Sequence, residues 1–236
     1  MSQTVHPTDF NMRSPHYRTL ISAGARFESC MNASCVMDYG NGKNQETAQA
    51  MQLGLADLTP LPRTGFKGPE MVQWASSAGL KIGRHNNRAY LQEDGLLVAR
   101  LSDSEILVLN GLGSRLDQCA RLEEKHKHSR PAGCYTVPRS SASAWLMLTG
   151  QYSTDALAKL CGVDLRVENF SGGAIAQTSV ARTNCIVIRN NMGEIPAFHL
   201  LFDCSSTEYM WSCLVDAGME FKGAPVGYAS LLELHY

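Results

Sequence analysis

The sequence predicts an α+β protein built from two successive strand-helix-strands-helix units with mostly antiparallel sheet. The first observation is that each half of the chain contains one short helix candidate, three strand-like runs and a longer closing helix. The second is that both short helices end in glycine and an aliphatic residue, "AGLKI" and "CGVDL", before an extended stretch. Strands that follow one another without intervening helices favour antiparallel pairing.

The amino-terminal fifth of the chain differs in composition from the rest. Residues 1–50 mix Ser, Asn, Gly, Gln and Met without a sustained period, and "DYGNGKNQE" at 38–46 has the composition of a loop. A segment with little apolar content does not offset its own ordering entropy. We therefore predict a partly irregular arm over 1–50 that becomes ordered against a partner, followed by units at 51–131 and 132–236.

The first unit begins with "LADLTPLPRTGF", which supplies a strand leading into "GPEMVQWASSAGL" at 68–80. This helix has Gly68 as its N-cap, Pro69 at the first helical position and Gly79 as its stop. Its apolar face consists of Met71, Trp74, Ala75 and Ala78. Three strands and a closing helix follow, as "RAYLQ", "LLVARLS", "EILVLNG" and "SRLDQCARLEEKH".

The second unit repeats this order. "YTVPRSSASAWLMLTG" supplies its first strand, and "STDALAKLCGVDL" at 153–165 is a helix with Ser153 or Thr154 as its cap and Gly162 as its stop. The apolar face of this helix consists of Ala156, Leu157, Leu160 and Cys161. The strands are "AIAQTSVA", "NCIVIRN" and "AFHLLFD", and the closing helix "STEYMWSCLVDAG" has Ser205 and Glu208 at the spacing of a capping box.

Composition and charge exclude several classes of function. Hydrophobic residues make up 44% and charged residues 18%, which is typical of a globular chain. The formal net charge of -1 gives no global attraction to nucleic acid or to an anionic membrane, so neither partner is expected. The first residues lack the apolar core of a secretory signal, and no run of about 18 apolar residues occurs. We therefore expect a cytoplasmic location and reduced cysteines.

Sequence motifs for metal, nucleotide and nucleophilic chemistry are incomplete. Cys30 and Cys35 have a spacing that zinc permits, but no second ligand pair follows, and no metal site is expected. "RTGFKG" at 63–68 does not have the order of a phosphate-binding loop, and "GLGSRL" has Leu116 where a dinucleotide fingerprint requires glycine. No hydrolase elbow is present, and nothing local supports a Cys-His dyad.

The histidines and tryptophans are interpreted as structural. "HKH" at 126–128 is typical of a frayed, solvated helix end, and His199 is expected to be a half-buried histidine with its hydrogen bonds satisfied. Apolar neighbours surround the tryptophans, which we assign to the core: Trp74, Trp145 and Trp211. No residue is predicted to be catalytic.

Three long stretches carry a family resemblance, which runs from about Gly54 to Leu232. "GLADLTPLPRTGFKGPEMVQWASSAGL", "NNRAYLQEDGLLVARLSDSEILVL" and above all "LCGVDLRVENFSGGAIAQTSVARTNCIVIR" resemble the gamma subunit of heterotetrameric sarcosine oxidase. This family belongs to a folate-binding group that includes the glycine-cleavage T-protein. The resemblance implies two linked ferredoxin-like units, in agreement with the repeat described above.

The resemblance also implies a complex in which alpha, beta, gamma and delta chains together oxidise N-methylglycine (sarcosine). FAD, FMN and NAD are then expected on the alpha and beta chains, and tetrahydrofolate is expected in the alpha chain as the one-carbon acceptor. No cofactor is expected on this chain itself, which would pack against its partner subunits as a non-catalytic member of the complex.

Residues at the positions of the family's acidic motif support a non-catalytic chain. Where the T-protein group is expected to have a carboxylate pair, this chain reads "GLLVARL", with Ala99 and Arg100 in those places. A methyl group and a guanidinium supply neither a proton acceptor nor a negative charge for a cationic methylene-iminium species. Asp57 persists in a second motif, but Thr59 and Pro60 replace its serine and histidine.

Two alternatives remain open from the sequence. The first is a freestanding folate-binding aminomethyltransferase or demethylase, because Glu93 and Asp94 lie close to the altered motif in the sequence. The second is an assembly or scaffold protein of the same fold. "AGCYTVPRS" resembles the centre of a motif in the folate-binding iron-sulfur assembly factor, but only Gly133, Cys134 and Tyr135 match, and Cys134 is therefore interpreted as a strand residue.

Three basic residues are candidates for contact with a partner subunit. Arg63 and Lys67 are expected to be exposed at a strand-to-helix corner, where they would meet an acidic patch of a neighbouring chain. Arg100 is added because it replaces an acid of the family motif. The alternative interpretation of Arg63 and Lys67 is that they serve solubility alone.

Overall fold

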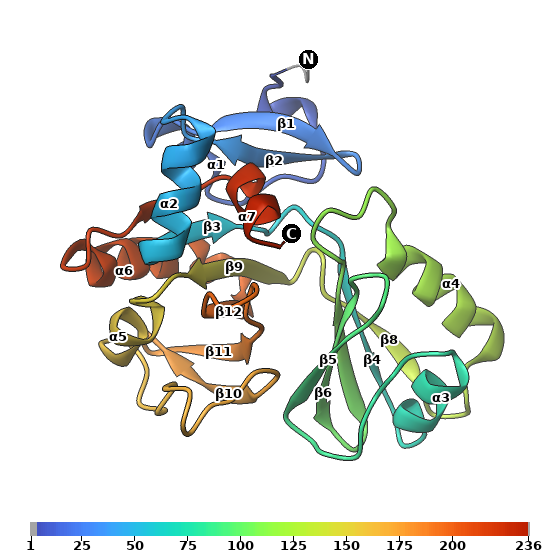
Figure 1. Ribbon diagram of the computed structural model, residues 1–236. Helices are drawn as coiled ribbons and strands as arrows, with labels where there is room; N and C mark the ends of the chain where they lie inside the picture. The colour runs from blue at the N-terminus through green and yellow to red at the C-terminus, as the bar shows by residue number, and fades with distance from the viewer. Residues whose placement is uncertain (1–3, 236) are drawn as a thin grey trace.

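The computed structural model describes residues 4–235, which form two large sheets that face one another, with helices on their outer sides, and a small two-stranded sheet (Figure 1). Residues 1–3 of the predicted arm and residue 236 of the predicted second unit lie outside the described residues. Among the described residues, no helix combines the length and the apolar character that crossing a membrane requires. The predicted α+β class with mostly antiparallel sheet is confirmed.

The five-stranded sheet, on the right of Figure 1, lies largely within the first unit. Its strand order is β5-β6-β7-β4-β8, and every neighbouring pair is antiparallel. Helices α3 and α4 cover its outer face through an apolar cluster that includes Phe66, Trp74 and Val108. The elements are β4 (Arg63–Lys67), α3 (Met71–Ser77), β5 (Arg88–Leu91), β6 (Leu97–Ser102), β7 (Glu105–Leu109), α4 (Gln118–Ser129) and β8 (Tyr135–Pro138).

The six-stranded sheet repeats this arrangement with one strand more. Its order is β10-β11-β12-β9-β3-β13, and its only parallel pair among the described residues is β13 with β3. Helices α5 and α6 pack on its outer face. The elements are β9 (Ser143–Thr149), α5 (Ser153–Ala158), β10 (Ile175–Val180), β11 (Thr183–Arg189), β12 (Ala197–Asp203), the 3-10 turn η2 (Cys204–Ser206), α6 (Thr207–Met219) and β13 (Ala224–Pro225).

The first strand of each predicted unit completes the sheet of the other unit. Strand β3 (Gly54–Asp57) precedes the five-stranded sheet in the chain, yet it pairs with β9 in the six-stranded sheet. Strand β8 precedes β9, yet it pairs with β4. The segments predicted as single entering strands are therefore two strands each, and the chain crosses between the sheets at 58–62 and at 139–142.

The N-terminal segment is regular where the sequence predicts an irregular arm. Residues 17–53 form a helix, a hairpin and a second helix, so the expectation of irregular chain is wrong over most of that range. Leu20, Phe27 and Val36 are buried in the cluster that also contains α6, and this tertiary packing orders the segment. The elements are η1 (Pro7–Asp9), α1 (Tyr17–Ser22), β1 (Arg26–Cys30), β2 (Ala33–Asp38) and α2 (Lys43–Leu53), with α7 (Tyr228–His235) packed against α2 and β2.

Helix boundaries follow the predictions in part. Gly79 has φ of 91° and ends α3, and the Leu80 amide donates to the Ala75 carbonyl at 3.0 Å, which confirms the predicted stop. The predicted start at Gly68 is wrong, because Glu70 is the N-cap and α3 begins at Met71. Gly68, with φ of 148°, instead lets the backbone lie close to Cys134, because a Cβ at this position would be 2.5 Å from the Cys134 sulfur.

The second unit differs in its caps. Helix α5 has Tyr152 as its N-cap and ends at Ala158, before the predicted stop at Gly162. The predicted capping box does not form, because the Asp203 carboxylate accepts the Ser205 amide at 2.8 Å and Glu208 accepts the Thr19 hydroxyl at 3.1 Å. The carboxylate of Glu208 thus joins α6 to α1.

An apolar layer fills the space between the two sheets. It receives alternate residues of β6 and β7 from one sheet and of β9, β11 and β12 from the other. At one edge the sheets touch directly, because the Ala89 amide donates to the Gly173 carbonyl at 2.7 Å. The layer is the part of the fold in which a ligand would contact both units.

Candidate functional site

Ala99 lies in the middle of the layer between the sheets. It is fully buried on β6, and its neighbours on the same strand face, Leu97 and Leu101, are also buried. The opposite sheet contributes Trp145 and Met147 to the same layer. A carboxylate is therefore absent from the position at which the sequence resemblance places one, and the layer around Ala99 is apolar.

His199 is a buried titratable group that contacts Trp145 of this layer. Its Nδ1 accepts the Trp145 indole N–H at 3.0 Å, and Asn190 lies 3.4 Å from its Nε2. Burial lowers the pKa of His199 to about 4, so the ring is neutral near neutral pH. The prediction of a hydrogen-bonded histidine is confirmed, although the side chain is fully rather than half buried.

The free space beside His199 is small. A cavity of about 20 Å³ lies between the sheets and is lined by residues that include Asn110, Trp145 and Asn190. A volume of this size holds roughly one water molecule. A pterin ring does not fit there, so the residues of the layer do not match a folate held at Ala99.

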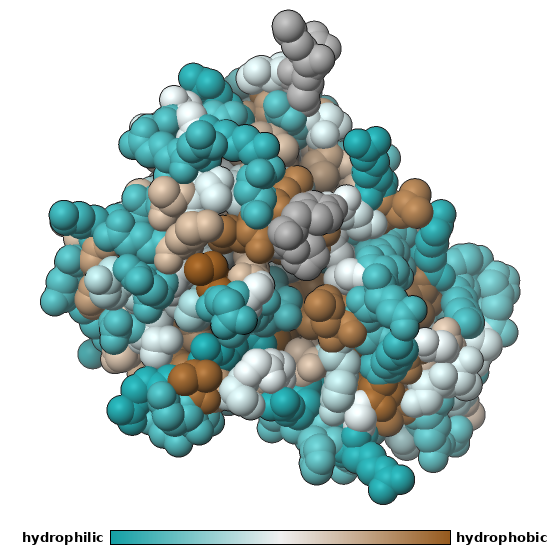
Figure 2. All heavy atoms as spheres, viewed as in Figure 1, coloured by the Kyte–Doolittle hydropathy of each residue, from teal (hydrophilic) through white to brown (hydrophobic). Residues whose placement is uncertain are grey.

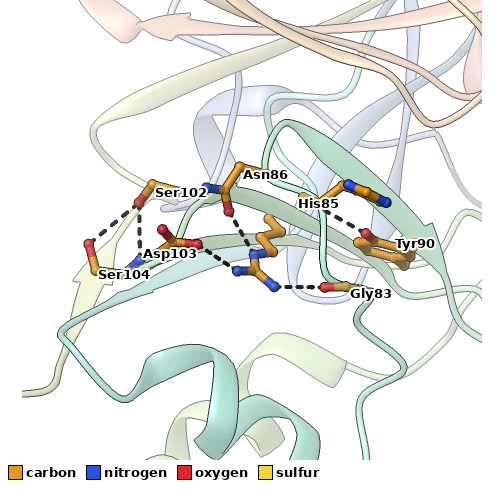
Figure 3. A network of polar contacts seen from close by, with 8 residues as sticks. Gly83, His85, Asn86, Tyr90, Ser102, Asp103 and Ser104 are labelled. Atoms are coloured by element: carbon orange, nitrogen blue, oxygen red, sulfur yellow. Dashed lines mark hydrogen bonds and ion pairs between the residues drawn. The ribbon is translucent and has the colours of Figure 1, made fainter.

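Arg100 follows Ala99 on β6, so its side chain lies on the opposite face of the strand. It holds a loop in place through Gly83 and Asn86, which Figure 3 shows together with Asp103. Its guanidinium donates to Asn86 Oδ1 and to the Gly83 carbonyl, both at 2.8 Å, and pairs with Asp103 at 2.7 Å. The Arg100 side chain is only 10% exposed. Little of the Arg100 side chain is therefore accessible to a partner subunit, which was its predicted contact. Its hydrogen bonds instead hold residues 83–86 in place.

Arg63 is buried where the chain first crosses between the sheets. The expectation that it is exposed is wrong, because only 1% of the residue is accessible. Its guanidinium donates to the Thr59, Leu61 and Ser140 carbonyls at 2.6, 2.8 and 3.0 Å, and also to the Ser143 carbonyl. Burial lowers the pKa of Arg63 to about 10, so the group stays charged at neutral pH.

Asp57 and Thr59 support the same crossing. The Asp57 carboxylate accepts the Thr59 amide at 3.0 Å, and the Thr59 hydroxyl accepts the Trp145 amide at 3.1 Å. The second Asp57 oxygen is buried without a hydrogen-bond partner among the described residues. Asp57, the acid that this chain shares with the family motif, thus stabilises the crossing at 58–62 and is not part of the layer around Ala99.

Lys67 is the predicted contact residue that the structure leaves accessible. Its side chain is 47% exposed and pairs with Glu105 at 3.2 Å. Arg139, which the sequence analysis did not single out, pairs with the same carboxylate at 2.7 Å. The group of Lys67, Glu105 and Arg139 therefore carries one excess positive charge beside the second crossing.

A cleft of about 530 Å³ begins at this charged group. It lies between β7 and the strands β10, β11 and β12, and its lining combines an apolar floor with hydroxyl, amide and charged side chains. The charged groups are Arg139 and Asp203. The Nε of Arg139 has no hydrogen-bond partner among the described residues, so this guanidinium retains donor capacity. The remaining lining consists of Leu107, Ala142, Ser143, Gln177, Thr178, Ser179, Asn184, Cys185, Ile186, Leu201 and Phe202.

Other groups considered in the sequence have structural positions. Cys134 is buried immediately before β8. His126 is buried against Phe66 and Trp74, so the prediction of a solvated helix end is wrong for this residue, while His128 is exposed. The three tryptophans are in the core as predicted. Within residues 4–235, no group of three His, Cys, Asp or Glu side chains is placed to hold a metal ion.

The sequence signal for the cleft is weak because its lining comes from five separated segments. Arg139 follows "YTVP" at a strand end, and no local motif distinguishes it from other surface arginines. The sequence indicates nothing about Asp203 except that it is the last residue of a buried strand. Pairing of β8 with β4, rather than with its neighbour in sequence, is what brings Arg139 to Glu105.

Comparisons with known proteins agree with this fold. The family model described as the GCVT N-terminal domain matches residues 16–235. The structure is similar to glycine cleavage system aminomethyltransferase T from Bartonella henselae, with a TM-score of 0.73 and 19% identity over 94% of this chain. The chain spans 61% of the length of that protein.

A second similar structure is heterotetrameric sarcosine oxidase from Corynebacterium sp. U-96 in complex with pyrrole 2-carboxylate. The TM-score is 0.63 and the identity 20%, over 78% of this chain and 95% of that chain. At these identities the two likenesses establish the fold alone. No curated protein sequence matches the chain.

Proposed function

The chain belongs to the GCVT N-terminal domain family, and from this premise we propose that it is a non-catalytic, gamma-type subunit of a heterotetrameric sarcosine oxidase. The complex would oxidatively demethylate N-methylglycine with folate as the one-carbon acceptor. The observation that carries the proposal is Ala99, fully buried in an apolar layer at the position where the resemblance leads us to expect a carboxylate. Without a proton acceptor there, this layer does not perform one-carbon transfer.

The second structural neighbour supports assembly with other chains. That neighbour is described as heterotetrameric, and 95% of its matched chain is covered by this protein. We propose alpha, beta and delta subunits as the partners. We also propose that tetrahydrofolate, FAD, FMN and NAD are bound by the partner subunits. For tetrahydrofolate, the 20 Å³ cavity beside His199 is too small to hold a pterin in the layer between the sheets.

Co-expression of the four chains tests the subunit role. The chain is produced with the alpha, beta and delta genes of its own genome and is purified through an affinity tag on this chain. We expect all four chains to be recovered in equal amounts, with sarcosine-dependent oxygen consumption in the purified complex. Recovery of this chain alone, together with an active complex of the other three, contradicts the proposal.

A freestanding folate-binding aminomethyltransferase or demethylase is the second candidate, and the 530 Å³ cleft is the observation that favours it. A drug-sized ligand fits a cleft of this volume, and Arg139 offers a donor for a carboxylate while Asp203 offers an acid. Calorimetric titration of the isolated chain with tetrahydrofolate separates the candidates. Binding that Arg139→Ala abolishes and the surface variant Arg121→Ala preserves supports the second candidate, and absence of heat at millimolar folate removes it.

A further inference from the structure

The loop at 83–88 joins α3 to β5 and includes Arg88, the first residue of β5. Residues 84–87 are exposed and irregular, yet the loop is held on several sides (Figure 3). Arg100 binds its first residues through Gly83 and Asn86, as described above. The Tyr90 hydroxyl lies 3.4 Å from the His85 carbonyl, which it binds as a donor. The Tyr90 ring also packs so closely on Gly83 that a Cβ there would lie 2.5 Å from the hydroxyl.

The second sheet holds the other end of the loop. The Ile175 amide donates to the Asn87 carbonyl at 3.0 Å, and the Gln177 side chain donates to Asn87 Oδ1 at 2.8 Å. Asn87 has φ of 56°, a conformation that costs energy for a side-chain-bearing residue and persists when its surroundings enforce it. Contacts from both sheets therefore fix the backbone of an exposed loop.

The side chains that this loop presents are basic and have no acidic partner. Arg84 and His85 are exposed, and Arg88 is half exposed with a hydrogen bond to the Ser171 hydroxyl at 3.1 Å. Among the described residues, no carboxylate lies within ion-pair distance of these three side chains. Asp103, which lies beside the loop, is paired with Arg100.

We infer that residues 83–88 form a preorganised cationic docking loop that takes a carboxylate-rich segment of a partner protein. A guanidinium recognises a carboxylate through two parallel hydrogen bonds, and arginine is enriched in protein interfaces. A loop that is already fixed loses little conformational entropy when it binds. That the partner is an oxidase subunit rests on the proposed function. That the loop binds carboxylates does not depend on the proposed function.

Charge complementarity favours an acidic protein segment over nucleic acid. The lower edge of the molecule in Figure 2, where this loop lies in Figure 1, is mostly hydrophilic. The cationic side chains of the loop are those of two arginines, Arg84 and Arg88, on a chain of net charge -1. Nucleic-acid binding proteins neutralise many phosphates over an extended basic surface. A short acidic segment of a protein matches the small extent and the positive charge of the loop.

Binding of a fluorescent poly-glutamate peptide to the full chain tests the loop directly. Fluorescence anisotropy at low ionic strength is compared for the wild type, the double variant Arg84→Glu/Arg88→Glu and the matched control Arg115→Glu/Arg121→Glu. The control arginines are also exposed and free of ion pairs among the described residues. We expect the loop variant to raise the Kd about tenfold or more and the control to change it less than about threefold.

Equal effects of the two double variants, or no binding by the wild type, overturn the inference. Tighter binding of a single-stranded oligonucleotide of equal charge through Arg84 and Arg88 overturns the assignment to a protein partner. Co-purification of the loop variant with the other oxidase chains separates this inference from the proposed function. If the complex forms but peptide binding does not depend on Arg84 and Arg88, the docking loop is ruled out and the proposed function stands. If peptide binding depends on these arginines but no complex forms, the proposed function is ruled out and the docking loop stands.

Discussion

At the scale of single residues, Arg63 is the clearest case of a polar side chain that holds the structure together. Its guanidinium satisfies four backbone carbonyls at a point where the chain passes between two sheets. We predict that Arg63→Met lowers the free energy of unfolding by about 4 kcal/mol or more, because four carbonyls lose their donor and each buried carbonyl left without one costs about 1–3 kcal/mol. Urea unfolding measures this loss.

The matched control for Arg63 is Lys67 on the same strand. Its amine is half exposed and makes a surface ion pair with Glu105, so Lys67→Met is expected to change stability by less than about 1 kcal/mol. A loss from Arg63→Met no larger than that from Lys67→Met would contradict the structural role of the buried guanidinium.

His199 gives a pH dependence with a defined sign. Burial lowers its pKa to about 4 in the folded chain, whereas the unfolded chain titrates near the usual value of about 6.5. Below pH 6.5 the unfolded state therefore binds the extra proton, and stability is lost as pH falls towards 4, by about 3 kcal/mol in total. We expect His199→Gln to flatten this slope in urea unfolding between pH 7 and about 4.5. Parallel slopes for the variant and the wild type would refute the assignment.

The position of a residue along a strand explains why the sequence misplaced Arg63. Arg63 and Lys67 lie on the same face of β4 because side chains repeat every two residues. Arg63 lies where the strand enters the crossing, and Lys67 lies at the opposite, solvated end. No local pattern distinguishes the two basic residues, since Arg63 is enclosed partly by Ser140 and Ser143, which lie far away in sequence at the second crossing.

At the scale of secondary-structure elements, Glu46 connects three parts of the N-terminal region. From α2, its carboxylate accepts the Tyr39 amide at 2.6 Å after β2 and the Gly227 amide at 3.0 Å before α7. We predict that Glu46→Gln costs about 1–3 kcal/mol, because the new amide group offers only one acceptor oxygen to two buried donors. Hydrogen exchange at Tyr39 and Gly227 should become faster.

Glu233 supplies the control for Glu46. It pairs with Lys43 between α7 and α2, but both side chains are largely exposed, at 44% and 61%. Glu233→Gln is therefore expected to change stability by less than about 1 kcal/mol and to leave exchange at Tyr39 unchanged. Faster exchange in both variants would mean that the helices separate for a reason other than loss of the Glu46 hydrogen bonds.

Element type was predictable from the sequence where apolar residues repeat with a clear period. The strands at 97–102, 105–109 and 183–189 and the apolar face of α3 follow directly from that pattern. Residues 17–38 were missed because their apolar residues, among them Leu20, Phe27 and Val36, show no sustained helical or strand period. Their packing against α6, more than 170 residues away, orders this segment, and a local pattern does not encode that contact.

At the scale of the whole molecule, the exchange of β3 and β8 links the two units. The sequence predicts the repeat but assigns each strand to the unit that follows it, because strand partners are set by long-range pairing. This exchange also creates the cleft, since the crossing at 139–142 carries Arg139 between the sheets. Ala99 could be identified from the sequence because its motif lies within one strand. The cleft could not, because its lining residues come from several strands.

The strand exchange predicts how fragments of the chain behave. Separation at the predicted unit boundary gives fragments 1–131 and 132–236, in which β3 lacks β9 and β8 lacks β4. Each fragment would also expose its half of the apolar layer, so we expect neither to unfold cooperatively alone. Mixed during refolding, the two should form a one-to-one complex with native circular dichroism, because the exchanged strands then find their partners. A cooperative thermal transition of fragment 132–236 by itself, measured by circular dichroism, would show that the units are independent and that the exchanged strands are dispensable.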